Sequence, residues 1–161
     1  MTVHELGHIV LYVKDLERSA RFYGEVLGWR QVKAPEGMPA ALFSSGRTHH
    51  ELLLIEVGPQ ARPVPQGHRL GLYHFGLKVG TTDEELAAMS ERLKAEGVRV
   101  VGATDHGVTH SLYILDPDGN EIELYIDVQP ETWRTDPEAV FASPRPLGLR
   151  PRKAGPAGRK R

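Results

Sequence analysis

The chain has 161 residues, of which 40% are hydrophobic and 25% charged, with a formal net charge of −1 and no Cys. These values predict a soluble, cytoplasmic globular protein built as one domain or as two small repeats around one core. Without Cys, a disulfide framework, a thiolate zinc site and a cysteine nucleophile are excluded, and no apolar run approaches the ~18 residues of a membrane span.

The first half of the chain opens with a run that is repeated later. Residues 7–13 (GHIVLYV) resemble residues 73–79 (YHFGLKV), 66 positions downstream. In each run a His precedes β-branched and aromatic residues, which is typical of a strand. Asp15 is then the expected N-cap of a helix whose apolar stripe runs to Leu27, with Gly28 as its stop. Further strands are expected at 29–33, 41–45 and 51–57.

The second half repeats this order after a Pro- and Gly-rich linker at residues 58–71. Thr82 and Glu85 fit a capping box, and Gly97 is the expected helix stop. Strands are predicted at 98–101, 111–115 and 121–128, and the last two are joined by a hairpin turn at 116–119. The fold class expected is therefore α+β. It would consist of two βαβββ repeats, about residues 4–57 and 72–128, that form a half-open mixed β-sheet barrel within one domain, residues 1–141.

Residues 142–161 are expected to form a basic tail. They contain seven Lys or Arg and no acidic residue, so the other 141 residues sum to −8 if the whole chain is −1. The richness in Pro and Gly predicts a solvated segment rather than a packed one. A tail of this charge is also compatible with a nucleic-acid arm, but the acidic body would repel phosphate. We therefore expect neither a nucleic-acid nor a membrane partner.

Three side chains are candidate metal ligands. His8 and His74 open equivalent strands in the two repeats, and strand alternation places Glu123 on one face with Glu121. A carboxylate that faces a sheet interior is costly unless it is paired or bound to a metal. Two imidazoles and one carboxylate form the facial triad of non-haem Fe(II) oxygenases, which leaves open positions for substrate and dioxygen. The pattern predicts a metal site made by His8, His74 and Glu123.

The paired repeats, these three residues and the segment 116–125 (DPDGNEIELY) resemble the vicinal oxygen chelate superfamily over about residues 4–130. That superfamily includes glyoxalase I, antibiotic-resistance proteins and type I extradiol dioxygenases. Three further segments resemble the extradiol branch: 49–54 (HHELLL), 106–111 (HGVTHS) and 113–119 (YILDPDG). The resemblance implies that His50 transfers protons, while His106 and Tyr113 position or polarise the substrate oxygens. His110 is the alternative to His106.

By this resemblance, the protein is expected to be an Fe(II)-dependent ring-cleaving dioxygenase that acts on a small catechol-like aromatic diol with O₂. Mn(II) also suits a site of two His and one carboxylate, so the metal stays open between the two. A homodimer or higher homo-oligomer is expected by the same analogy. Apolar strand residues are expected to face the aromatic ring, and they are Leu52, Leu54, Phe75 and Leu77.

Two other functions stay open. A glyoxalase-type metal-dependent isomerase or lyase usually needs a fourth protein ligand, but the repeat alignment places Leu53 at the position equivalent to Glu123. Glu56, near the end of the same predicted strand, is the carboxylate that could still fill that role. A metal-free binding protein of the bleomycin-resistance kind would not require His8, His74 and Glu123 together.

Overall fold

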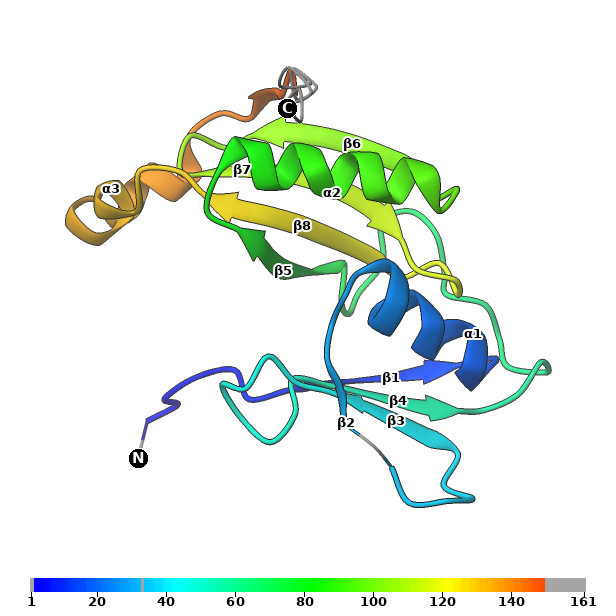
Figure 1. Cartoon of the computed structure of the whole chain (residues 1–161). Helices are drawn as coiled ribbons and strands as arrows, with labels where there is room; N and C mark the ends of the chain where they lie inside the picture. The colour runs from blue at the N-terminus through cyan, green and yellow to red at the C-terminus, as the bar shows by residue number, and fades with distance from the viewer. Residues whose placement is uncertain (1, 33, 150–161) are drawn as a thin grey trace, which may run out of the picture. The chain divides into compact units, whose positions relative to one another are not determined.

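The same order of strands and helices occurs twice along the chain in the computed structural model, which describes residues 2–32 and 34–149 (Figure 1). The first repeat contains β1 (Ile9–Val13), α1 (Leu16–Arg21), the short π-helix η1 (Phe22–Val26), β2 (Gln31–Val32), β3 (Ala40–Phe43) and β4 (Leu52–Glu56). The second contains β5 (His74–Gly80), α2 (Asp83–Ala95), β6 (Val100–Asp105), β7 (Thr109–Leu115) and β8 (Glu121–Asp127). Helix α3 (Pro130–Thr135), the 3-10 helix η2 (Pro137–Phe141) and β9 (Arg145–Pro146) follow.

The strands form two mixed sheets of matching topology. The first sheet has the order β1-β4-β3-β2 and the second β5-β8-β7-β6-β9. In each sheet the first strand of the repeat pairs in parallel with the last, so β1 pairs with β4 and β5 with β8. The predicted α+β fold with two βαβββ repeats is thus confirmed. Among the described strands, hydrogen bonds join each sheet separately and do not close them into a barrel.

The helices begin and end where their capping residues predict. The side chain of Asp15 accepts a hydrogen bond from the backbone N–H of Arg18 at 2.8 Å, which caps α1. Thr82 and Glu85 form the reciprocal capping box of α2. After α1 the chain continues directly into η1, and it then turns at Gly28, where φ is +77°. A positive φ costs Gly little, so this residue allows the chain to leave the helix and enter β2.

Each sheet has one apolar face that packs on a helix. In the first repeat β3 and β4, with their buried side chains, contact α1, and in the second β5 and β8 contact α2. Figure 1 shows each helix along one face of the sheet of its own repeat. Strand alternation turns the intervening residues to the opposite face of each sheet. In the second repeat that opposite face carries His74, Tyr113, Glu121, Glu123 and Tyr125.

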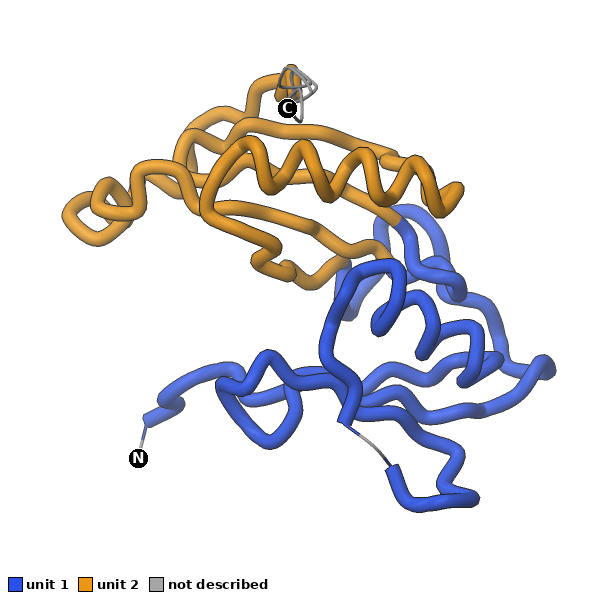
Figure 2. Tube along the Cα trace, viewed as in Figure 1, with its two compact units in different colours: residues 1–73, 115–120 blue, residues 74–114, 121–161 orange. Residues whose placement is uncertain are grey.

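The chain divides into two compact units, which are described separately below (Figure 2). Unit 1 contains residues 1–73 and 115–120, and unit 2 contains residues 74–114 and 121–161. The turn between β7 and β8 therefore belongs with unit 1. Within unit 1, the buried Asp116 carboxylate of this turn accepts a hydrogen bond from the Tyr23 hydroxyl at 2.8 Å and others from the backbone of Asp118 and Asn120.

The structure differs from the predicted elements at three places. Strand β6 extends four residues beyond the predicted end at Val101, to Asp105. Short helices occupy the stretch after β8, and residues 145–146 of the predicted tail pair with β6 as β9. Residues 150–161 of that tail lie outside the described residues. No helix in residues 2–32 and 34–149 is long and apolar enough to cross a bilayer.

Candidate active site

Five polar side chains gather on the face of unit 2 that points away from α2. We call them the unit 2 cluster, and they are His74, His106, Tyr113, Glu121 and Glu123. The register places His74 of β5 opposite Glu121 of β8, and Gly76 opposite Glu123. Because β8 lies between β5 and β7, its outward carboxylates can be reached from both neighbours. The sheet register therefore brings together residues that are up to 49 positions apart in the sequence.

Hydrogen bonds and ion pairs connect the members of this cluster. His74 Nε2 lies 3.4 Å from Glu123 Oε2, and His74 Nδ1 lies 3.5 Å from Glu121 Oε1. The Tyr113 hydroxyl donates to Glu123 Oε1 at 3.2 Å. His106 Nε2 is 2.9 Å from the same hydroxyl and 4.0 Å from Glu123 Oε1. Glu123 is thus the centre of the cluster, with an imidazole and a phenol on its two oxygens.

A tight hairpin between β6 and β7 presents His106. The His106 backbone N–H donates to the Thr109 carbonyl at 2.9 Å, and Gly107 has a φ of +83°. The Asp105 carboxylate accepts the Gly107 N–H at 2.7 Å and is 2.9 Å from Arg145. That backbone hydrogen bond, and then the Arg145 charge, hold the pKa of Asp105 below its usual range. The carboxylate is therefore ionised near neutral pH and fixes the turn that carries His106.

His110 does not join the unit 2 cluster. Its Nδ1 lies 2.6 Å from Asp83 at the start of α2, and its Nε2 lies 3.7 Å from Asp105. Strand alternation explains the difference, because His110 and Tyr113 are three positions apart on β7 and face opposite sides of the sheet. Of the two alternatives at this segment, His106 is the one that lies beside Tyr113 and Glu123.

A second group of imidazoles occurs in unit 1. We call it the unit 1 histidines, and its members are His8, His49 and His50. The ring centroids of His8 and His50 are 4.6 Å apart, and Nδ1 of His49 is 2.5 Å from Nδ1 of His50. Desolvation, followed by the neighbouring His49 and His8, lowers the pKa of His50. His50 is therefore neutral near neutral pH and can accept a proton.

The donor chemistry of the unit 2 cluster fits a divalent transition metal. Imidazole and carboxylate are the ligand types of a non-haem iron or manganese site, and His74 Nε2 and Glu123 Oε2 converge to 3.4 Å. Within residues 2–32 and 34–149, no three His, Asp or Glu side chains are arranged to hold a metal ion. His8, the remaining predicted ligand, belongs to unit 1, whereas His74 and Glu123 belong to unit 2.

The carboxylate that could have been a fourth ligand has another partner. Glu56 Oε2 accepts the backbone N–H of Leu16 at 2.8 Å, so it caps the start of α1. The register also fixes the repeat equivalence, because Leu53 pairs with Val10 as Glu123 pairs with Gly76. The position in unit 1 that corresponds to Glu123 is therefore apolar.

The expectation that Leu52, Leu54, Phe75 and Leu77 face an aromatic substrate is wrong, because all four lie on the helix side of their sheets. Leu52 and Leu54 are at most 1% exposed and belong to the core on the α1 side of their sheet, and Phe75 is buried on the α2 side of the other. Leu77 shares the face of Phe75 by alternation. The apolar residues on the opposite face of the unit 1 sheet are instead Val10, Tyr12, Leu42, Leu53 and Ile55.

Two residues on the face of the unit 2 cluster, one inside the cluster and one beside it, were not among the predicted site residues. Glu121 lies against His74, although alternation already places it on the same face as Glu123. Tyr125 lies next along this face, and a Cβ at Gly76 would come within 3.2 Å of its ring and 3.8 Å of Glu123 Oε2. Gly76 thus leaves room for the Tyr125 ring over β5. Desolvation raises the pKa of Tyr125, so its hydroxyl stays protonated.

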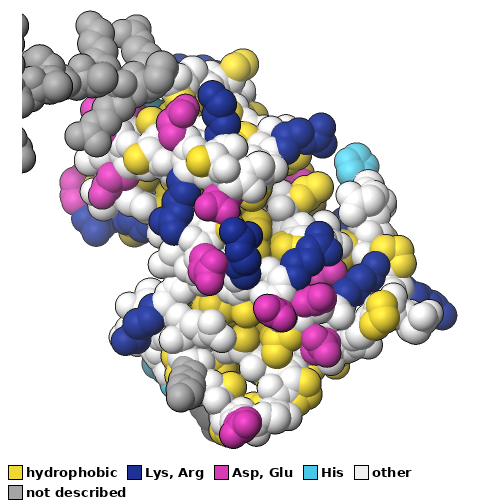
Figure 3. Space-filling model, turned by 45° about the vertical axis from the view of Figure 1, so that its right-hand side comes forward, with side chains coloured by type: hydrophobic (Ala, Val, Ile, Leu, Met, Phe, Trp, Pro, Cys, Tyr) yellow, Lys and Arg dark blue, Asp and Glu magenta, His cyan; other side chains and the backbone are white. Residues whose placement is uncertain are grey.

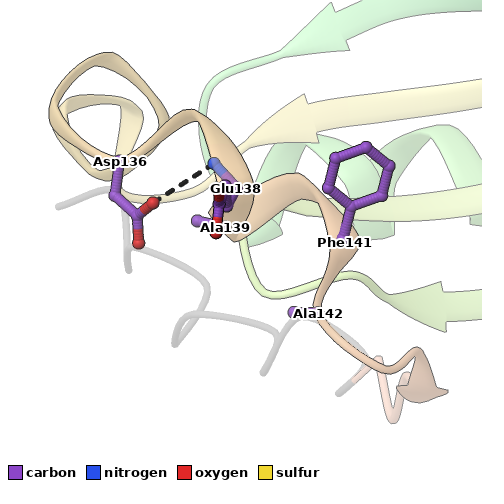
Figure 4. A pocket seen from close by; sticks show the side chains of 5 residues that line it. All are labelled: Asp136, Glu138, Ala139, Phe141 and Ala142. Atoms are coloured by element: carbon purple, nitrogen blue, oxygen red, sulfur yellow. Dashed lines mark hydrogen bonds between the residues drawn. The ribbon is translucent and has the colours of Figure 1, made fainter.

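Two other features of the described surface bear on whether it offers a nucleic-acid interface or a ligand pocket. On the face drawn in Figure 3, basic side chains lie among acidic ones rather than in the continuous basic patch that a nucleic-acid interface needs. A shallow hollow in unit 2 is lined by Asp136, Glu138, Ala139, Phe141 and Ala142 (Figure 4). In it, the Asp136 carboxylate caps the Glu138 N–H at 3.2 Å, so its polar group already has a structural partner.

Comparisons with known proteins point to a family. The family model described as "Glyoxalase/Bleomycin resistance protein/Dioxygenase superfamily" matches residues 5–124. The chain is 36% identical to a catechol-2,3-dioxygenase of Bacillus subtilis, over 87% of this chain and 48% of that protein. It is 32% identical to biphenyl-2,3-diol 1,2-dioxygenase 2 of Rhodococcus globerulus, over 76% and 63% respectively.

Solved structures include a similar fold. The crystal structure of lactoylglutathione lyase from Agrobacterium tumefaciens aligns with a TM-score of 0.59 and 26% identity, and covers 82% of this chain and 98% of that one. The chain spans about half the length of the catechol-2,3-dioxygenase that it matches. Both oxygenases and a lyase are therefore among the proteins that it resembles.

Proposed function

Because the chain belongs to the Glyoxalase/Bleomycin resistance protein/Dioxygenase superfamily, we propose that it is a metal-dependent extradiol dioxygenase that cleaves a catechol-like aromatic diol with O₂. The observation that carries the proposal is the convergence of His74, His106 and Tyr113 on Glu123 within unit 2. Its similarity to two ring-cleaving dioxygenases supports the same substrate class.

In this proposal the metal is Fe(II), with Mn(II) as the alternative, and its ligands are His74, Glu123 and His8. His8 is included in the ligand set because its position in the first repeat is equivalent to that of His74 in the second. When bound, Fe(II) would supply a Lewis-acidic centre for the two diol oxygens and for dioxygen. The apolar position of Leu53 supports a set of three protein ligands, which leaves positions for both reactants.

The remaining polar residues handle protons and charge. A catechol must lose protons to bind a metal through both oxygens, and a neutral imidazole can take one. His50 is suited to this role because desolvation lowers its pKa. The Tyr113 hydroxyl and His106 Nε2, 2.9 Å apart, would donate to substrate oxygens on which negative charge develops. Tyr113 already donates to Glu123, so it is held in place before substrate arrives.

The test is oxygen uptake by the anaerobically Fe(II)-loaded protein with a panel of substituted catechols, together with metal analysis. We expect stoichiometric iron, oxygen consumption and a yellow ring-opened product. Variants His74→Ala and Glu123→Ala should lose both iron and activity, whereas Asp127→Asn, on the same face of β8, should keep both. Iron binding without oxygen uptake on any catechol would contradict the proposal.

A second candidate function is a glyoxalase-type isomerase or lyase, which the similarity to a lactoylglutathione lyase favours. It is tested by adding a hemithioacetal to protein loaded with Zn(II), Ni(II) or Fe(II). Turnover there, with no oxygen consumption on catechols, would replace the dioxygenase proposal. If no metal binds, a metal-free small-molecule binding protein becomes the leading function.

A further inference from the structure

A second carboxylate lies on the far side of the His74 ring from Glu123. Glu121 is the residue directly opposite His74 in the parallel pairing of β5 with β8. Its Oε1 lies 3.5 Å from His74 Nδ1, while Glu123 Oε2 lies 3.4 Å from His74 Nε2. The imidazole therefore stands between two carboxylates, one at each ring nitrogen.

The contact at Nδ1 is shielded from water. Nδ1 of His74 and Oε1 of Glu121 are both inaccessible to solvent, although the two side chains as wholes are 26% and 23% exposed. A buried carboxylate oxygen is costly unless a donor compensates it. His74 Nδ1 is the ring nitrogen nearest this oxygen, at 3.5 Å, so a proton on Nδ1 would be the donor that compensates it once the two atoms close to hydrogen-bond distance.

The equivalent carboxylate in unit 1 has different partners. By the sheet register Glu51 corresponds to Glu121, because Leu53 pairs with Val10 as Glu123 pairs with Gly76. Glu51 accepts the Ser45 backbone N–H at 2.7 Å and the Ser45 hydroxyl at 2.6 Å, and it lies 3.5 Å from Arg47. Glu51 thus fixes a loop, whereas Glu121 faces the imidazole. The two repeats have kept a carboxylate at the same register position and use it differently.

We propose that Glu121 is a positioning residue, which holds the His74 ring with its proton on Nδ1 and its Nε2 lone pair toward Glu123. This inference rests on the proposed function, because it assigns Nε2 of His74 as the atom that binds the metal. A carboxylate that accepts the other ring N–H fixes the tautomer and orientation of a ligating His and makes it more basic. Glu121 itself is not a ligand in this assignment.

The division of roles between the two carboxylates follows from their contacts. Glu123 accepts the Tyr113 hydroxyl and lies within 4.0 Å of His106, so it faces the other polar groups of the cluster. Glu121 instead lies 3.5 Å from Nδ1 of His74, the ring atom turned away from Glu123. A metal held by Nε2 and Glu123 leaves Nδ1 and Glu121 as a pair behind it.

The experiment uses the full chain, with Glu121→Gln and Glu121→Ala as variants and Asp127→Asn as the matched control. The change Asp127→Asn removes a carboxylate charge from the same face of β8, but the carboxylate of Asp127 pairs with Lys78 and not with His74. The first readout is anaerobic Fe(II) affinity, measured by competition with a chromophoric chelator. We expect affinity about 10–100-fold lower in Glu121→Ala, a smaller loss in Glu121→Gln, and a change below about threefold in Asp127→Asn.

The second readout needs no metal. In ¹⁵N-histidine-labelled metal-free protein at about pH 8, two-bond ¹⁵N–¹H correlations report which ring nitrogen carries the proton. The His74 signals are assigned by their loss in His74→Asn. The wild type and Glu121→Gln, which keeps an acceptor oxygen, should carry the proton on Nδ1. Glu121→Ala should lose this preference, an effect that a purely structural role would not produce.

Unchanged affinity together with an unchanged tautomer in Glu121→Ala would overturn the inference. Should that variant fail to fold, as judged by circular dichroism, the near-isosteric Glu121→Gln still decides through its affinity relative to Asp127→Asn. A wild-type protein that binds no Fe(II) would instead refute the proposed function. The tautomer measurement would then still test whether Glu121 controls His74.

Discussion

His50 is neutral in this arrangement because desolvation and two neighbouring imidazoles disfavour its charged form. The change His50→Phe keeps a ring of similar size and removes the proton acceptor. We expect kcat to fall about 100-fold while bound iron is retained. The acid limb of the kcat/KM profile should flatten, because the wild type loses its base as pH falls through the lowered pKa.

The control for this change is His49→Phe, which alters the adjacent imidazole and leaves His50 in place. It should keep most of the activity. Loss of iron from His50→Phe would contradict the role in proton transfer and would make His50 a ligand instead. Iron content is read by atomic absorption after desalting, and turnover by oxygen uptake.

The Tyr113 hydroxyl joins His106 to Glu123 and makes contacts of 2.9 and 3.2 Å. In Tyr113→Phe a donor to developing negative charge is lost, while all three proposed metal ligands remain. We expect kcat to fall about 100-fold with iron content unchanged. Tyr125→Phe removes the hydroxyl of the next tyrosine on this face of the sheet and should be nearly silent. Equal losses in both variants would argue against a specific role for Tyr113.

At the residue scale, the sequence could predict which ionisable side chains share a strand face, but not the facing of apolar ones. In β8, alternation of Glu and Ile or Leu separates the two faces clearly. In β4, the run Leu52–Ile55 is apolar on both faces, so nothing in it distinguishes the helix side from the other. The wrong expectation for Leu52 and Leu54 has this origin. The pairing of Glu121 with Nδ1 of His74 depends on sheet register, which no short motif encodes.

At the scale of elements, the turn 115–120 is fixed by a buried hydroxyl–carboxylate contact with η1. Tyr23 is fully buried, and desolvation raises its pKa, with the Asp116 charge as the next cause. Tyr23→Phe removes one donor from a carboxylate that is only 5% exposed. We expect the free energy of unfolding to fall by about 1–3 kcal/mol in urea titrations. Tyr12→Phe, at a residue 70% exposed, should change it little.

The hairpin between β6 and β7 should respond to acid through Asp105. The backbone N–H of Gly107, and then Arg145, lower the pKa of its carboxyl in the folded state. Ionised Asp105 therefore stabilises the fold above its unfolded pKa of about 3.9, and this stabilisation is lost as pH falls through the lower folded value. Asp105→Asn should cost about 1 kcal/mol near pH 7 and little near pH 2. An equal cost at both pH values in urea unfolding would contradict this.

Element boundaries were predictable where a capping or turn residue marks them. Asp15, Thr82 and Gly28 each stand at the helix end that their chemistry favours. The end of β6 was placed too early because Gly102 interrupts the β-branched run, although the strand tolerates it with a shifted register. The stretch 130–141 has no regular apolar stripe, and its two short helices are begun by Pro130 and Pro137 instead.

At the scale of the whole molecule, metal binding is expected to raise the free energy of unfolding. The proposed ligands come from both units by sequence, and an ion that binds only the folded chain stabilises it by about 2.7 kcal/mol at 100 times Kd. Thermal melts with Fe(II) under anaerobic conditions, or with Mn(II), should therefore shift upward in the wild type. His8→Ala, His74→Ala and Glu123→Ala should each abolish most of the shift. A full shift in His8→Ala would remove that residue from the ligand set.

The interleaving of the two units along the chain means that neither can be produced alone by cutting at the linker. A fragment that ended within residues 58–71 would contain Tyr23 and the first turn of α1, but no Asp116 to accept the Tyr23 hydroxyl. It would also lack the Pro117 carbonyl, which accepts a hydrogen bond from the Arg18 side chain at 2.9 Å. The Asp118 carboxylate, which accepts the Lys14 backbone N–H at 3.2 Å, would be missing as well. A nick at the linker should thus leave two pieces that co-purify, because the N-terminal piece is completed by residues 116–118 of the other.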